Sequence, residues 1–255
     1  NVDDSTKYLG RKLNFSDPHR TEVESRIASA WKKFFVQKQE LTSKTYSLND
    51  RLRLFHGTVT PTVLYGCEAW TMTVELENRL QRTQRQMLRM ILQSPRRRII
   101  AQSDTDSSDT TNQTSDEIPP TDEVTLEPWQ EWISRCTHEA ESRMKKLKLE
   151  DWKTIQRRRK WKWAHKVAMS TQDSWILRAL NWDPSPHLGL LQNRRVGRPK
   201  KRWADDIKEY VDRTMYNATP LPSINPRLDN MYWLGHARSA VTWMQLGEGY
   251  VTRTV

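Results

Sequence analysis

The chain has 255 residues, of which 36% are hydrophobic, and a formal net charge of +11. Two cysteines are too few for a disulfide framework or a cysteine-rich zinc site, and no apolar run approaches the roughly 20 residues that span a bilayer. We therefore expect an intracellular protein in a reducing compartment, nuclear or cytoplasmic, with no membrane partner. Because the first residue is Asn rather than Met, we also expect the chain to be part of a longer protein.

The charge is divided into three blocks along the chain. Residues 1–101 carry 18 basic and 10 acidic residues, residues 102–127 carry 8 acidic and no basic residues, and residues 128–255 carry 24 basic and 13 acidic residues. The net charges are therefore +8, −8 and +11. Segment 102–127 is rich in Ser, Thr and Asp and has no aromatic residue, which predicts a disordered linker. The basic blocks predict two lobes that bind a polyanionic partner.

A short strand and three helices are predicted before the linker. The strand ends in a turn at Gly10, and apolar residues then repeat at intervals of three or four in 19–41, 51–70 and 75–93. Pro61 predicts a kink in the second helix. The third helix carries a row of arginines that a basic run after the helix extends. Such a row is either a solvated face or a surface that follows a phosphate backbone: Arg79, Arg82, Arg85, Arg89, Arg96, Arg97 and Arg98.

The same apolar repeat predicts helices beyond the linker, over 128–149, 151–169, 174–181, 203–216 and 228–246. Tryptophans at helical spacing are more typical of a core than of a base-stacking surface. Trp161 is the exception, because it points away from the stripe formed by Trp152 and Trp163. We expect it to stack on bases among the basic residues of its helix, which are Arg157, Arg158, Arg159, Lys160 and Lys162.

The segment RRVGRPKKRWADDI, from Arg194 to Ile207, is the most basic part of the chain. It could be an arm that enters the minor groove of DNA or a nuclear localisation signal. Asp205 and Asp206 follow at the start of a helix, where acidic side chains interact favourably with the helix dipole, and we favour that role over metal binding. The candidate nucleic-acid contacts in this segment are Arg194, Arg195, Arg198, Lys200, Lys201 and Arg202.

Several motifs resemble segments of the reverse transcriptases of non-LTR retrotransposons, the long-interspersed-element type. They are KYLG at 7–10, RLRLFHGTVTPTVLYGCEAW at 51–70, RRRKWKWAHKVAM at 157–169, the spacing of Trp175, Leu180 and Trp182, and the segment RRVGRPKKRWADDI. In that family a KYLG segment forms the hairpin that grips the primer, and the second block lies in the thumb. The resemblance therefore implies that Tyr8, Leu9 and Gly10 form a primer grip, although a simple strand end is the alternative.

The resemblance implies a mainly α fold with two helical lobes. Residues 1–18 would be the primer-grip segment, 19–101 a thumb-like three-helix bundle, 102–127 the acidic disordered linker and 128–255 a basic, Trp-rich C-terminal domain. The acidic segment departs from the family pattern, in which the thumb continues with little interruption.

The resemblance also implies a function, the binding of an RNA or DNA duplex without sequence specificity, with the palm and fingers of a parent polymerase as partners. Asp3 and Asp4 lack the flanking apolar strands that two-metal chemistry requires. We therefore expect no catalytic residues, metal site or cofactor in this chain, with magnesium bound only by the full-length parent. The alternatives are a basic helical scaffold with a nuclear localisation signal and, more remotely, a nuclease that uses Asp205 and Asp206.

Overall fold

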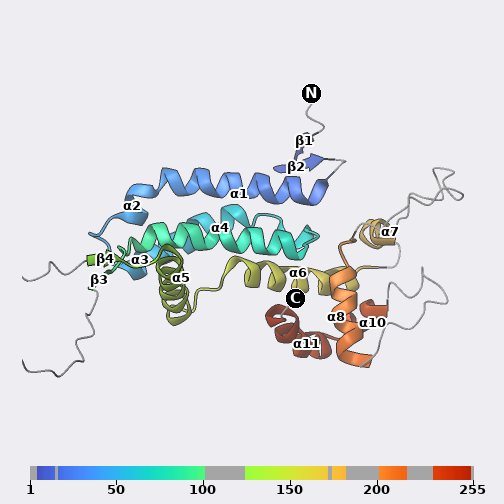
Figure 1. Ribbon diagram of the computed structural model, residues 1–255. Coiled ribbons are helices and arrows are strands. Elements are labelled where there is room, and N and C mark those ends of the chain that lie inside the picture. The colour runs from blue at the N-terminus through green and yellow to red at the C-terminus, as the bar shows by residue number, and fades with distance from the viewer. Residues whose placement is uncertain are drawn as a thin grey trace, which may run out of the picture.

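The computed structural model describes residues 5–14, 17–100, 124–171, 174–181, 201–216 and 232–253. Helices dominate this part of the chain, which confirms the predicted fold class (Figure 1). The helices are α1 (Pro18–Val36), α2 (Lys38–Thr42), α3 (Leu48–Val63), α4 (Val74–Leu92), α5 (Trp129–Lys146), α6 (Trp152–Ala168), α7 (Trp175–Asn181), α8 (Asp205–Tyr216), α10 (Tyr232–Arg238) and α11 (Ala240–Thr252). The strands are β1 (Ser5–Tyr8), β2 (Arg11–Asn14), β3 (Arg98–Ile100) and β4 (Val124–Leu126).

The predicted strand with a turn at Gly10 is present as one half of a hairpin. β1 and β2 are antiparallel, and Leu9 and Gly10 between them have φ values of 47° and 78°. Two consecutive positive φ angles match the twist of a tight hairpin. At the second of these positions, glycine adopts a positive φ without strain. Lys12 N donates to a carboxylate oxygen of Glu22 at 2.7 Å, which ties the hairpin to α1. Tyr8 and Leu9 are exposed at the tip, and their role in gripping a primer stays a prediction.

The first hydrophobic core lies between α1, α3 and α4. These helices bury the apolar faces that their sequences predict, and three side-chain caps fix where they begin. Asp17 caps α1, Ser47 caps α3 and Thr73 caps α4, each by accepting a backbone N–H from the third residue after it. Local sequence therefore sets the starts of all three helices. The buried apolar residues of these helices include Val23, Ile27, Ala30, Phe34, Leu52, Phe55, Val59, Val63, Leu80, Met87, Leu88 and Ile91.

Two predicted helices are each divided into two. The first breaks at Gln37 into α1 and α2, and the last breaks at Ser239, whose hydroxyl caps α11. The helix whose apolar face was predicted from Leu52 to Val63 ends at Val63, and it tolerates Pro61 in its last turn. Gly66 then adopts a left-handed conformation with φ of 67° and redirects the chain into a short 3-10 turn over Cys67–Ala69.

Helix α6 connects two hydrophobic cores. Its first residue, Trp152, is fully buried in the first core and stacks on Phe55, with ring centroids 5.8 Å apart. Farther along the same helix, Trp161 lies in a second core with α8, α10 and α11 and stacks on Trp243 at 3.6 Å. The division between the cores therefore falls within α6, whereas the sequence suggested a division at 102–127. α5, which follows that segment, contributes Ala140 to the first core.

The end of the predicted linker is ordered, although residues 101–123 lie outside the described part of the chain. β4 pairs with β3, and Glu127 directly after it is buried. The Glu127 carboxylate accepts hydrogen bonds from the guanidinium of Arg135, at 2.9 and 2.7 Å, and from the backbone N–H of Arg97. The hydrogen bonds from Arg135 lower the pKa of Glu127 to about 2. The prediction of disorder is thus wrong for 124–127, because a charged side chain fastens this segment to α5.

We expect the attachment of β3 and β4 to α5 to weaken in acid. Because the folded pKa of Glu127 lies below its usual value of 4.5, its charged form stabilises the fold above about pH 4.5. That contribution is lost as the pH falls towards 2. The protection of backbone amides in 96–99 and 124–131, measured as exchange rates relative to those of an unfolded peptide at the same pH, should fall across this window, and Glu127→Gln should remove this loss of protection. Glu131→Gln, at an exposed position on α5, should leave it intact.

Candidate nucleic-acid interface

A groove of about 540 Å³ lies between α4 and α5. Figure 1 shows α5 running across α4, so that the two helices form the walls of the groove. One wall consists of basic residues from the predicted arginine row, and the other is mixed in character. The lining residues are Arg82, Arg85 and Arg89 from α4, and Ile133, Ser134, Thr137, His138 and Glu141 from α5.

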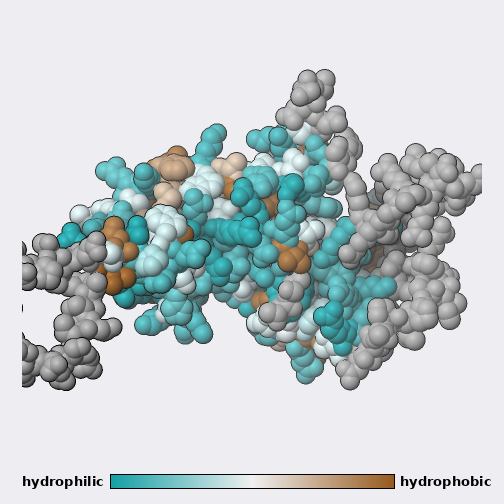
Figure 2. Space-filling model, viewed as in Figure 1, coloured by the Kyte–Doolittle hydropathy of each residue, from teal (hydrophilic) through white to brown (hydrophobic). Residues whose placement is uncertain are grey.

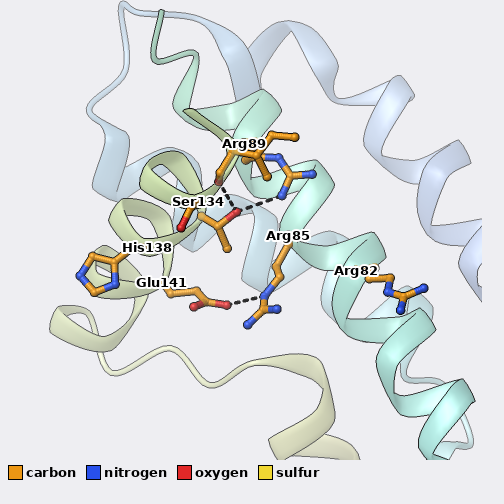
Figure 3. A pocket seen from close by; sticks show the side chains of 8 residues that line it. Arg82, Arg85, Arg89, Ser134, His138 and Glu141 are labelled. Carbon is orange, nitrogen blue, oxygen red and sulfur yellow. Dashed lines mark hydrogen bonds and ion pairs between the residues drawn. The ribbon is translucent and has the colours of Figure 1, made fainter. Parts of the chain in front are cut away.

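The three arginines share the groove because they are spaced by three and four residues on one helix. Arg85 Nε donates to a carboxylate oxygen of Glu141 at 2.7 Å, and Arg89 donates to the hydroxyl of Thr137 at 3.0 Å (Figure 3). Arg82 lies apart from these pairs and is exposed, with no hydrogen bond or ion pair to any described residue. Partial burial lowers the pKa of Arg89, but a guanidinium stays charged at neutral pH.

The rest of the predicted arginine row lies outside the groove. Arg79 pairs with Glu24 at 3.1 Å and so joins α4 to α1. Arg96 donates to the backbone carbonyl of Glu127, which is a structural contact. Arg97 and Arg98 are exposed and donate no side-chain hydrogen bond to a described residue, although the charge of Arg97 helps to lower the pKa of Glu127.

The structure corrects the prediction that Arg157 and Lys160 contact nucleic acid. Arg157 is 2% exposed and makes two hydrogen bonds to the carboxylate of Glu77, at 2.9 and 2.6 Å. Lys160 is 1% exposed, and its ammonium donates to Asp206 at 2.7 Å. Both side chains are enclosed because α6 is covered on one side by α4 and on another by α11. Their charges stabilise the fold and are not accessible to a ligand.

The prediction for Trp161 is wrong for a similar reason. Its indole is 5% exposed and donates to the carbonyl of Trp243 at 2.9 Å, while Trp243 donates to the carbonyl of Trp161 at the same distance. This reciprocal pair leaves no face for a base. Trp129, predicted to face the core, is instead 58% exposed, and Trp175 is 80% exposed.

The remaining predicted contacts on α6 differ in their surroundings. Arg158 is held between Glu150 and Glu248, at 2.7 and 2.5 Å, and the hydrogen bonds that its guanidinium donates to Glu248 and Glu150 raise its pKa. Arg159 donates to the backbone carbonyl of Leu64 at 3.1 Å. Lys162 is exposed, with no partner among the described residues.

Only the end of the basic segment 194–202 is described. Lys201 is half-buried and Arg202 is exposed, whereas Arg194, Arg195, Arg198 and Lys200 lie outside the described residues, as do Asp3 and Asp4. A contribution of this segment to nucleic-acid binding therefore stays a prediction.

Asp205 and Asp206 have different roles. A carboxylate oxygen of Asp205 accepts the backbone N–H of Arg202 at 2.6 Å, which is a local contact at the start of α8. Asp206 is 7% exposed and binds the ammonium of Lys160, the hydroxyl of Tyr250 at 2.8 Å and the guanidinium of Arg253 at 3.1 Å. The burial of Asp206 alone would raise its pKa, but these partners outweigh it, so the pKa is lowered. Among the described residues no three His, Cys, Asp or Glu side chains gather as metal ligands.

The chain is 26% identical over 236 residues to an uncharacterised transposon-derived protein of Caenorhabditis elegans. The alignment covers 92% of this chain and 70% of the nematode protein. No protein-family model and no solved structure matches. None of the described helices is long and apolar enough to cross a membrane.

Proposed function

We propose that this chain is the nucleic-acid-binding C-terminal part of a retrotransposon RNA-directed DNA polymerase. It would hold a template–primer duplex by its phosphates, without sequence specificity. The observation that carries the proposal is the groove between α4 and α5, which gathers three arginines from one helix face. The similarity to a transposon-derived protein supports an origin in a mobile element.

The groove suits phosphate because its arginines are available to an incoming anion. Arg82 has no partner among the described residues, and both side chains of the ion pair between Arg85 and Glu141 are partly exposed. Exposed ion pairs contribute about 0–1 kcal/mol, so a phosphate group can displace Glu141 at little cost. A guanidinium can then donate two parallel hydrogen bonds to phosphate oxygens. Contacts of this kind position a duplex but do not read its bases.

In this proposal the chain alone catalyses nothing and needs no cofactor. The palm, the fingers and the magnesium-binding aspartates would belong to the upstream part of the parent polymerase, which would be the protein partner of this chain. The hairpin tip at Tyr8 and Leu9 is exposed and free to contact a primer end.

Neutralising the groove should weaken duplex binding and its dependence on salt. Each arginine that contacts a phosphate contributes about 1 to the slope of log affinity against log salt. We therefore expect Arg82→Gln with Arg85→Gln to lower the slope for an RNA–DNA duplex by about 2, measured by fluorescence anisotropy at several salt concentrations. Glu141→Gln should raise the affinity, because it releases Arg85 and removes a negative charge from the groove.

The matched control is Lys32→Gln with Lys38→Gln, which removes two exposed positive charges that do not line the groove. If the control variant lost as much affinity and slope as the groove variant, binding would reflect net charge alone. The proposed site would also be wrong if Glu141→Gln lowered the affinity.

A further inference from the structure

Trp129 is an exposed aromatic residue held in a fixed place at the start of α5. Its ring lies 4.7 Å from that of Trp132, with the two planes tilted by 34°. Trp132 is itself anchored, because its indole N–H donates to the carbonyl of Ser94 at 2.9 Å. With 58% of its surface exposed, Trp129 is supported from within the protein and still presents much of its surface to solvent.

Trp129 stands at one end of the arginine groove. Ile133 lines the groove, and residues four apart on a helix share one face. Trp129 is therefore about 6 Å before Ile133 along the axis of α5, and it precedes the residues of this helix that line the groove. Across from it, the chain leaves α4 and brings the guanidinium of Arg96 over the Trp129 ring, 5.9 Å from the centroid.

The surroundings of Trp129 combine positive charge with apolar surface. Arg97 and Arg98, next to Arg96 in the chain, are exposed, and neither guanidinium donates a hydrogen bond to a described residue. Ile99 and Leu126 are exposed on the strand pair that follows, and Figure 2 shows a hydrophobic spot at this end of the molecule, beside β3 and β4. A ligand for this surface needs a flat apolar group joined to a negative charge.

We propose that Trp129 stacks on an unpaired base of a nucleic-acid strand as that strand leaves the duplex in the groove. The inference rests on the proposed function, because the groove must hold the duplex. A nucleotide matches the surface in both respects, since its base has an apolar face and its phosphate can bind Arg97 or Arg98. Stacking on an aromatic side chain tolerates any base, in keeping with binding that does not read sequence.

The test compares three RNA–DNA duplexes bound by the full chain. One is blunt, one carries a short unpaired adenine extension on the DNA strand, and one carries an abasic extension of the same length, which has the phosphates but no bases. We expect the adenine extension to bind more tightly than the abasic one. Stacking contributes about 1–3 kcal/mol per base, so Trp129→Ala should reduce this difference in affinity by about 5- to 140-fold. Trp129→Phe should retain most of it.

Trp175→Ala is the matched control, because Trp175 is even more exposed but lies on α7, away from the groove. If the blunt duplex binds but adenine and abasic extensions bind equally, the stacking role is wrong and the proposed function still stands. If the blunt duplex does not bind, the proposed function fails. The stacking role then fails as well, unless a single-stranded adenine oligonucleotide binds the wild type and loses that binding in Trp129→Ala. An equal loss in Trp129→Ala and Trp175→Ala would also overturn the inference.

Discussion

Replacing Asp206 by asparagine should destabilise the protein by about 3–5 kcal/mol, the usual cost of removing one partner from a buried ion pair. The carboxylate binds Lys160, which is 1% exposed, and also Arg253 and Tyr250. Asparagine has nearly the same size but no charge, so the variant leaves the ammonium of Lys160 buried without an opposite charge. Urea unfolding measured by circular dichroism would give the difference in free energy.

Two controls separate the lost ion pair from a general effect of mutation. Asp205→Asn changes the neighbouring aspartate, whose contact with the N–H of Arg202 is local, and should cost at most about 1 kcal/mol. Adding Lys160→Met to Asp206→Asn removes the stranded charge and should recover much of the loss. Equal costs for Asp205→Asn and Asp206→Asn would contradict the assigned roles.

The effect of Asp206→Asn should also depend on pH. The folded pKa of Asp206 is lowered, so its charged form stabilises the fold above its usual value of 3.8. That contribution is lost as the pH falls through the folded pKa. The difference between the wild type and the variant should therefore be full near neutral pH and shrink in acid.

Helix starts could be predicted from the sequence because their causes are local. Ser47, Thr73 and Asp151 each cap a helix through a backbone N–H only three residues away. Helix ends were less predictable where a single residue redirects the chain. Gly66, which has a positive φ, follows the end of α3 and turns the chain into the 3-10 segment.

The surroundings of α6 could not be predicted because they depend on distant residues. Arg157 binds Glu77, which is 80 positions away, and Lys160 binds Asp206, which is 46 away. A run of basic residues on a helix usually faces water, and nothing in the local sequence indicates that acidic partners will cover it. Trp161 was misplaced for the same reason, since α11 supplies its partner Trp243.

Only one wall of the groove could be predicted from the sequence. The spacing of Arg82, Arg85 and Arg89 indicates a common face, and the structure places all three in one cavity. The second wall comes from α5, and Glu141, which pairs with Arg85, is 56 residues farther along the chain. The acidic segment lies between α4 and α5 in the sequence and has no helical repeat. The sequence therefore gives no sign that these two helices pack together.

Trp152→Ala should have the second large effect, a loss of about 3–5 kcal/mol, because truncating a fully buried tryptophan leaves a cavity. The Trp152 ring is stacked on Phe55, and its indole N–H donates to the hydroxyl of Thr60 at 2.8 Å. Its backbone N–H donates to the side chain of Gln84 at 3.0 Å, so one residue contacts both α3 and α4. Trp152→Phe keeps an aromatic ring and should cost less.

Trp152 also tests how the two cores depend on each other. It begins α6, and the same helix carries Trp161 in the second core. If α6 couples the cores, Trp152→Ala should accelerate hydrogen exchange in α10 and α11 as well as in α3 and α4, and unfolding should remain one transition. Thr60→Val is the control, because it removes only the acceptor of the indole N–H and should cost about 1–3 kcal/mol. Faster exchange confined to α3 and α4 would mean that the second core folds independently of the first. Nucleic-acid binding by exposed residues of the second core would then survive unfolding of the first core.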